Sequence, residues 1–187
     1  DTTGTAITST VAELNKLDDS LASNILTLGA GVNTTESYAT GIMRNGNIVT
    51  TRIVVDISTL IGSATDLDII GESAAVDCHF GQITTAKSGT LIGGSVECLE
   101  VPAGGSTDID FYSSTVGTGT QDVIITDAAL GTETALVTAG GAWTSGAVKG
   151  MTSLPTANDY LYIINGAASG GTFTAGKFLI TLYGYVA

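Results

Sequence analysis

The stretch NIVTTRIVVDISTL, residues 47–60, carries a β-branched side chain at nine of its fourteen positions. Branching at Cβ restricts the rotamers, suits a pleated sheet and lowers helix propensity. The rest of the chain repeats this pattern, because β-branched runs alternate with turns rich in its 25 glycines, while proline occurs only twice. The composition therefore predicts a mainly β fold built from short strands.

Working outward from this stretch, the same pattern predicts seven further strands. They are Val76–Thr85, Thr90–Val101, Asp108–Tyr112, Asp122–Thr126, Thr134–Thr138, Tyr160–Ile164 and Lys177–Tyr185. Eight or more strands at this spacing are typical of two packed sheets. We therefore expect a β-sandwich or jelly-roll-like domain over residues 46–187, with an irregular barrel as the alternative.

One pair of these strands is predicted to form a hairpin around the turn Lys87-Ser88-Gly89. In that register Cys78 lies opposite Cys98. Both cysteines and Ile92 share one side of the hairpin, and this side is predicted to face the core. The two cysteines could form a disulfide, but free thiols are favoured if the chain folds in a reducing cytosol.

Residues 1–45 differ from the rest and are predicted to form an N-terminal arm that contains a short helix. Thr10 and Glu13 fit a capping box, which satisfies the first free amides of a helix. The leucines that follow recur at helical spacing and form one apolar stripe; they are Leu14, Leu17, Leu21 and Leu28. A short helix needs a surface to pack on, either its own β-domain or a neighbouring subunit. The four leucines are therefore candidate interaction residues.

The charge of the chain excludes several classes of partner. It has 18 acidic and 6 basic residues, a formal net charge of −12. The cations are scattered singly, whereas a protein that binds phosphates needs several together. We therefore expect no binding to nucleic acid and none to an anionic membrane surface. The chain contains no run of about 20 apolar residues, so the sequence predicts no transmembrane helix.

The reactive residues form no pattern that predicts an enzyme. His79, the only histidine, shares a strand face with Asp77, but no serine lies in a nucleophile-elbow motif, so we expect a surface histidine. Alternate aspartates could offer carboxylates to calcium, yet an EF-hand also needs a glycine and a glutamate that are missing, so solvated carboxylates are expected. These aspartates are Asp66 with Asp68 and Asp108 with Asp110. We expect no catalytic residue, no cofactor and no metal site.

Two short stretches resemble virion proteins of tailed bacteriophages. Residues 8–18, TSTVAELNKLD, are similar to a Thr-rich lead and an Ala-Glu-Leu-Asn-x-Leu-Asp core found in fibre-like and capsid-associated phage proteins. Asp19 stands where a glycine usually follows that core. Residues 174–185, TAGKFLITLYGY, resemble the closing strand of proteins from marine and cyanobacterial phages. Together the two stretches cover about an eighth of the chain.

The resemblance implies a capsid decoration (cement) protein with a β-sandwich fold. Its expected location is the exterior of the virion capsid, and the host cytoplasm during assembly. The implied partners are the major capsid protein and further copies of the chain, as a homotrimer. A tail-fibre, baseplate or receptor-binding component is the alternative, which predicts exposed aromatics such as Trp143, Tyr112 or Tyr160. Core packing is the other interpretation of these side chains; it is favoured for Tyr160 and stays open for Trp143. A bacterial surface subunit and a polysaccharide depolymerase are further alternatives.

Overall fold

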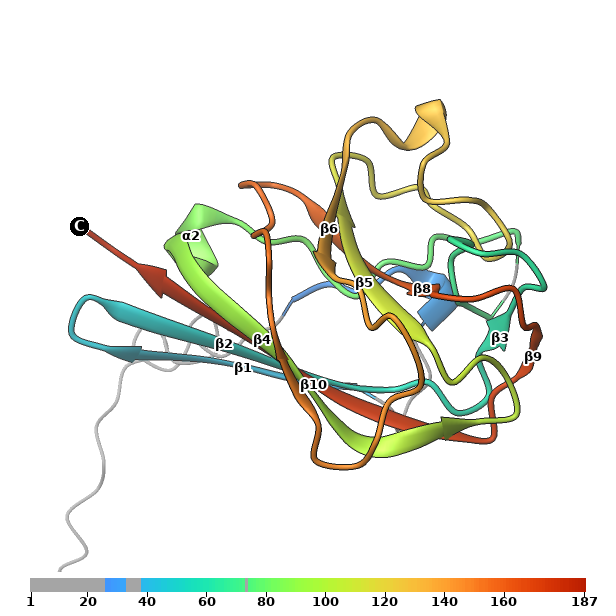
Figure 1. The fold of residues 1–187 in the computed structure, drawn as a ribbon. Coiled ribbons are helices and arrows are strands. Elements are labelled where there is room, and N and C mark those ends of the chain that lie inside the picture. Colours follow the sequence, from blue (N-terminus) through green and yellow to red (C-terminus); the bar gives the residue numbers. More distant parts are fainter. Residues whose placement is uncertain (1–25, 33–37, 73) are drawn as a thin grey trace, which may run out of the picture.

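The computed structural model describes residues 26–32, 38–72 and 74–187. The fold is mainly β, as the composition predicted, and the strands pair in antiparallel fashion. Figure 1 shows the long strands of a five-stranded sheet beneath the shorter strands of a three-stranded sheet. The arrangement is sandwich-like, with the hydrophobic core between the two layers.

The larger layer has the strand order β1-β2-β10-β4-β7. Its strands are β1 (Tyr38–Asn45), β2 (Ile48–Asp56), β10 (Ala175–Tyr185), β4 (Thr90–Ala103) and β7 (Val148–Gly150). β1 and β2 form a hairpin that turns at Gly46, whose φ of 61° is accessible to glycine at little cost. The central strand β10 pairs with β2 in one continuous register, but its pairing with β4 shifts in register at three places.

The smaller layer has the strand order β6-β5-β8. These strands are β6 (Glu133–Val137), β5 (Ile109–Ser114) and β8 (Tyr160–Asn165), and a separate two-stranded sheet pairs β3 (Ile61–Gly62) with β9 (Gly171–Thr172). The helical elements are η1 (Ala30–Val32), α2 (Thr85–Ser88) and η2 (Ala128–Leu130). Thr84 caps α2, because its side chain accepts a hydrogen bond from the backbone N–H of Lys87.

Aromatic rings from both layers meet in the core. The rings of Phe111, Trp143 and Phe178 contact one another edge to face, with centroids 5.2 to 6.1 Å apart. The indole Nε1–H of Trp143 donates a hydrogen bond of 2.8 Å to the carbonyl oxygen of Ile109, which satisfies its only polar group. Trp143 is therefore a core residue, and the exposed position that the receptor-binding alternative requires of it is excluded.

Five predicted strands are confirmed with small differences at their ends, namely β4, β5, β6, β8 and β10. The stretch 47–60 forms β2 only as far as Asp56. Residues 122–126 form no strand and contribute one isolated bridge, between Asp68 and Ile124.

The predicted hairpin between residues 76–85 and 90–101 is wrong. Its proposed turn is the capped helix α2, and the segment before it bonds to distant parts of the chain. The Cys78 N–H donates to the carbonyl of Gly119, whereas Cys98 on β4 pairs with Phe178 on β10. The cysteines therefore do not face each other, and both are buried thiols outside any disulfide, which confirms the preferred interpretation.

The predicted arm, residues 1–45, overlaps the β-domain at its end. Tyr38–Asn45 forms β1 and pairs with β2 along its whole length, so these eight residues belong to the larger sheet. The predicted helix of the arm lies outside the described residues.

Candidate functional site

Among the four leucines predicted to mediate interactions, only Leu28 lies within the described residues. It is half-buried and packs against the hydrophobic core of its own chain. For Leu28 the contact is therefore with its own β-domain. The contacts of Leu14, Leu17 and Leu21 stay a prediction, because these residues lie outside the described part of the chain.

A larger apolar surface lies on the side of the five-stranded sheet that faces away from the smaller layer, here called the outer face. Among the described residues, eight of the ten exposed large hydrophobic side chains belong to strands of this sheet. The most exposed are Met43 at 65%, Val148 at 62% and Ile92 at 60%. The other five are Ile48, Leu99, Val101, Tyr183 and Tyr185. Strand register places Met43, Ile48, Val148, Tyr183 and Tyr185 on the outer face, whereas Ile92, Leu99 and Val101 lie where the pairing of β4 with β10 is irregular.

Strand register brings several of these side chains together at one end of the sheet. Met43 pairs with Thr50, and Thr50 pairs with Tyr183. In the next row, Ile48 pairs with Tyr185. Residues that pair directly point to the same side of an antiparallel sheet. The patch at this end is therefore continuous across β1, β2 and β10.

Two irregularities in the pairing of β4 with β10 bring further apolar side chains to the surface. The register shift at Tyr183/Gly184 leaves Ile92 as an extra residue on β4, and the shift at Lys177/Phe178 leaves Leu99 extra. A bulge of this kind re-aims the side chains of the longer strand. Both extra residues are exposed, so the prediction that Ile92 faces the core is wrong.

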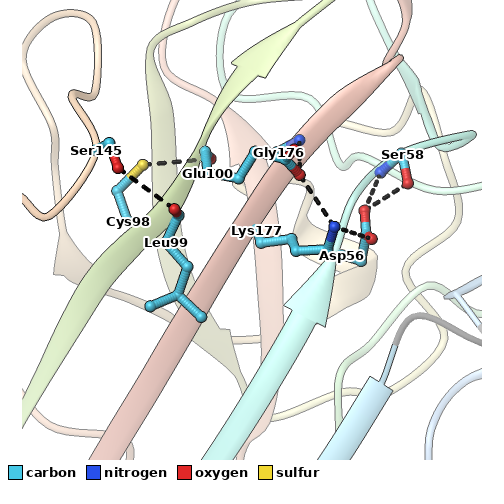
Figure 2. A network of polar contacts seen from close by, with 8 residues as sticks. All are labelled: Asp56, Ser58, Cys98, Leu99, Glu100, Ser145, Gly176 and Lys177. Atoms are coloured by element: carbon cyan, nitrogen blue, oxygen red, sulfur yellow. Dashed lines mark hydrogen bonds and ion pairs between the residues drawn. The ribbon is translucent and has the colours of Figure 1, made fainter.

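The opposite end of the outer face is polar, as Figure 2 shows. Lys177 Nζ lies 3.1 Å from Asp56 Oδ2 and 3.1 Å from Glu100 Oε2. Burial alone would raise the pKa of Asp56, but hydrogen bonds from Ser58 and from Lys177 outweigh burial and lower that pKa. The same carboxylates raise the pKa of Lys177. Exposed pairs of this kind add little to stability, so their main effect is to neutralise charge locally.

The outer face is nearly neutral, although the molecule is acidic. By register it carries two cations and three carboxylates, a net charge of −1, whereas the whole chain carries −12. These residues are Arg52, Lys177, Asp56, Glu97 and Glu100. A nearly neutral, apolar surface on an acidic protein has the features of a surface that docks on another protein.

His79 is buried, so the predicted surface position is wrong. Its Nδ1 accepts a hydrogen bond of 3.3 Å from the backbone N–H of Gly81, and its ring lies edge-on to Tyr160 with centroids 4.8 Å apart. Burial lowers the pKa of His79, and the nearby carboxylate of Asp77 opposes this effect only in part. The lowered pKa favours the neutral imidazole, which acts as a hydrogen-bond acceptor through Nδ1.

Two of the paired aspartates are also buried, contrary to the solvated positions predicted for them. Asp68 accepts a hydrogen bond of 2.6 Å from the hydroxyl of Ser63. The pKa of Asp110 is raised, chiefly by burial and also by the charge of Asp108. The backbone N–H of Ala139 donates a hydrogen bond of 2.6 Å to Asp110 and opposes this increase in part. Within residues 26–32, 38–72 and 74–187, no group of three His, Cys, Asp or Glu side chains could hold a metal ion.

No protein-family model, no curated protein and no solved structure matches this chain. In the part of the chain that the structure describes, no helix is both long enough and apolar enough to cross a membrane. A function for the chain therefore has to be argued from the outer face and from the residues themselves.

The sequence contained one signal for the outer face that strand prediction alone did not use. In residues 178–185 both alternating sets of side chains are mainly apolar, with Phe178 and Ile180 in one set and Leu179, Tyr183 and Tyr185 in the other, where Thr181 is the polar exception. A strand with apolar residues on both sides is typical of sheets that are covered on both faces.

Proposed function

We propose that this chain is a non-enzymatic virion structural protein of a tailed bacteriophage, a capsid decoration (cement) protein. It binds the outer surface of the assembled capsid through the major capsid protein and stabilises the shell against the internal pressure of packaged DNA. The resemblance of residues 8–18 and 174–185 to phage virion proteins supports the phage origin.

The observation that carries the proposal is the outer face. Exposed side chains such as Met43, Ile92 and Val148 on one sheet favour coverage by another protein surface. An interface of about 800 Å² per partner is sufficient for a specific contact. Repetition over a capsid lattice then multiplies modest contacts through avidity. A decoration protein needs such a face and a rigid β body, and it needs no catalytic group.

The distribution of charge supports the same use of the molecule. A net charge of −12 repels phosphate backbones, so the chain would not compete for the genome during assembly. The outer face carries a net charge of only −1, so it meets little electrostatic repulsion when it approaches a protein shell.

The N-terminal segment is a second part of the proposed attachment. Leu14, Leu17 and Leu21 would extend the contact to a neighbouring subunit or to the major capsid protein. The homotrimer implied by the resemblance belongs to the same proposal, because copies at threefold positions would share these contacts.

Capsid binding by outer-face variants tests the proposal. Capsids prepared without this protein are mixed with purified chain, and the bound protein is counted after sedimentation. We expect saturable binding of the natural sequence and at least about tenfold weaker binding of the double variant Ile92→Ser, Tyr183→Ser. Ile124→Ser is the matched control, because it removes an exposed apolar side chain outside the five-stranded sheet, and it should bind normally.

Each outcome of this experiment addresses a different part of the proposal. Equal occupancy by the double variant and by Ile124→Ser would contradict the outer face as the docking surface. No binding by the natural sequence would contradict a decoration protein. Deletion of residues 1–25 should lower occupancy, and unchanged occupancy would contradict a role for the N-terminal leucines.

The receptor-binding alternative loses one of its candidate residues, because Trp143 is buried. Tyr112 and Tyr160 are only half-buried, so they stay compatible with it. Adsorption of labelled protein to host cells at about 100 nM discriminates between the two functions. A receptor-binding component should label cells at this concentration, whereas a decoration protein should bind capsids and leave cells unlabelled.

A further inference from the structure

A cavity that is separate from the outer face opens beside His79. Its volume is about 350 Å³, which lies at the lower end of the range for small-molecule sites. Six residues line it: Thr27, His79, Gln82, Thr84, Lys87 and Tyr160. They come from four different parts of the fold, and the isolated bridge between Gln82 and Tyr160 joins two of these parts.

One wall of the cavity presents an oriented hydrogen-bond donor. Because Nδ1 of the neutral His79 ring accepts the N–H of Gly81, the ring proton must be on Nε2. The imidazole is held in this orientation by that hydrogen bond and by the edge-on contact with Tyr160. His79 therefore offers an N–H donor that needs no rearrangement before binding.

Two further lining side chains are each fixed through one polar atom. Nε2 of Gln82 donates a hydrogen bond of 2.9 Å to the carbonyl of Asn158, which leaves its Oε1 as an acceptor. The hydroxyl oxygen of Thr84 accepts the N–H of Lys87 at 3.4 Å, which leaves the hydroxyl hydrogen as a donor. Fixed side chains lose little entropy when a ligand binds, so such a site is preorganised.

The Tyr160 ring supplies an apolar wall, and it is fixed as well. A Cβ atom placed on Gly117 would lie 2.5 to 2.8 Å from atoms of this ring. The ring therefore packs directly on the backbone of Gly117 and occupies one position. The ring also contacts His79 edge-on, so an apolar surface lies beside the imidazole donor.

We propose that this cavity binds a single pyranose unit of a glycan. Each sugar hydroxyl both donates and accepts, which matches the donors of His79 and Thr84 and the acceptor of Gln82. The C–H face of a pyranose is apolar and can pack on the ring of Tyr160. Lys87 gives the lining one cation, but an anion fits less well than a neutral sugar, because Asp77 lies near His79 and the chain carries a net charge of −12.

Amide NMR of the full chain tests this site, with the Gly81 amide as a reporter because it donates to His79. The probes are methyl α-D-glucopyranoside, methyl β-D-galactopyranoside and N-acetyl-D-glucosamine, with inorganic phosphate as the anionic probe. We expect at least one sugar to shift the Gly81 and Gln82 signals saturably, with a Kd of about 1–10 mM. Gln82→Ala should weaken this binding at least about tenfold, whereas the control Gln121→Ala should not.

Three results would overturn the proposal. The first is no saturable shift with any of the sugars up to about 50 mM. The second is sugar binding that Gln82→Ala leaves unchanged. If Gln82→Ala fails to fold, Thr27→Ala takes its place, because Thr27 is an exposed residue of the same lining; unchanged sugar binding by this variant would also overturn the proposal. The third is binding of phosphate alone that Lys87→Gln abolishes, which would make the cavity an anion site.

Discussion

The two faces of the five-stranded sheet are made by the same strands but have different surroundings. On β10, Phe178, Ile180 and Leu182 are buried beneath the smaller layer, whereas Tyr183 and Tyr185 are exposed on the outer face. Both faces carry large apolar side chains, so hydrophobicity alone does not separate core from contact surface. The difference lies in what covers each face. We therefore expect substitutions of inner residues to change stability and substitutions of outer residues to change binding.

The largest expected effect is on the inner face, at Phe178. This ring is fully buried and contacts those of Phe111 and Trp143 at centroid distances of 5.2 and 5.4 Å. Phe178→Ala should lower the free energy of unfolding by about 3–5 kcal/mol, because it leaves a cavity between the layers. Urea denaturation followed by circular dichroism measures this free energy. A decrease below about 1 kcal/mol would contradict close packing of the Phe178 ring in the core.

A smaller loss is expected at Trp143. Trp143→Phe keeps an aromatic ring but removes the N–H that donates to Ile109, leaving a buried carbonyl unpaired. The free energy of unfolding should fall by about 2 kcal/mol. Tyr185→Phe on the outer face is the control and should stay within about 0.5 kcal/mol of the natural sequence. Similar losses for both variants would remove the distinction between the faces.

Asp110→Asn should raise stability, by about 1 kcal/mol at pH 7. The folded state holds the pKa of Asp110 above its usual value of 3.8, chiefly through burial. The natural chain therefore loses stability as the pH rises from about 3.8 through the pKa of the folded state, and asparagine avoids this loss. Thermal unfolding from pH 3 to pH 8 should show equal stabilities at the acidic end and a growing difference above it. A difference that does not depend on pH would exclude the buried charge as its cause.

The smallest effect on stability is expected at Ile92, the exposed bulge residue of β4. Because this side chain is exposed at a bulge, Ile92→Thr should change the free energy of unfolding by less than about 0.5 kcal/mol. The same variant should still bind capsids more weakly than the natural sequence. A loss of stability above about 2 kcal/mol would place Ile92 in the core and end the contrast between the faces.

Local patterns in the sequence were sufficient to predict most long strands but not their partners. β4 and β10 have alternating or continuous apolar runs that predict strands from the residues alone. The pairing of Cys98 with Phe178 joins segments far apart in the sequence, and no turn residue indicates it. A hairpin with the neighbouring segment was the simpler prediction, and the capped helix α2 takes the place of its turn.

The predictions of exposure failed for a related reason. His79 and Asp110 are polar residues in segments with strand-like alternation, so both were placed at the surface. The structure buries them because backbone N–H groups of Gly81 and Ala139 satisfy their side chains. Such local partners are set by the tertiary fold and leave no periodic trace in the sequence. The candidate site was missed in the same way, since bulges in β4 expose Ile92 and Leu99.

The central position of β10 also determines when the larger sheet can form. This strand lies between β2 and β4, which precede it in the chain by a long separation. Until β10 arrives, β2 and β4 have open edges that can pair with other chains. Formation of the sheet is therefore a late step governed by contacts between distant residues, which is typical of slow folding. During synthesis, the half-built sheet is the species most exposed to aggregation, and chaperones that shield strand edges should raise the yield of folded protein.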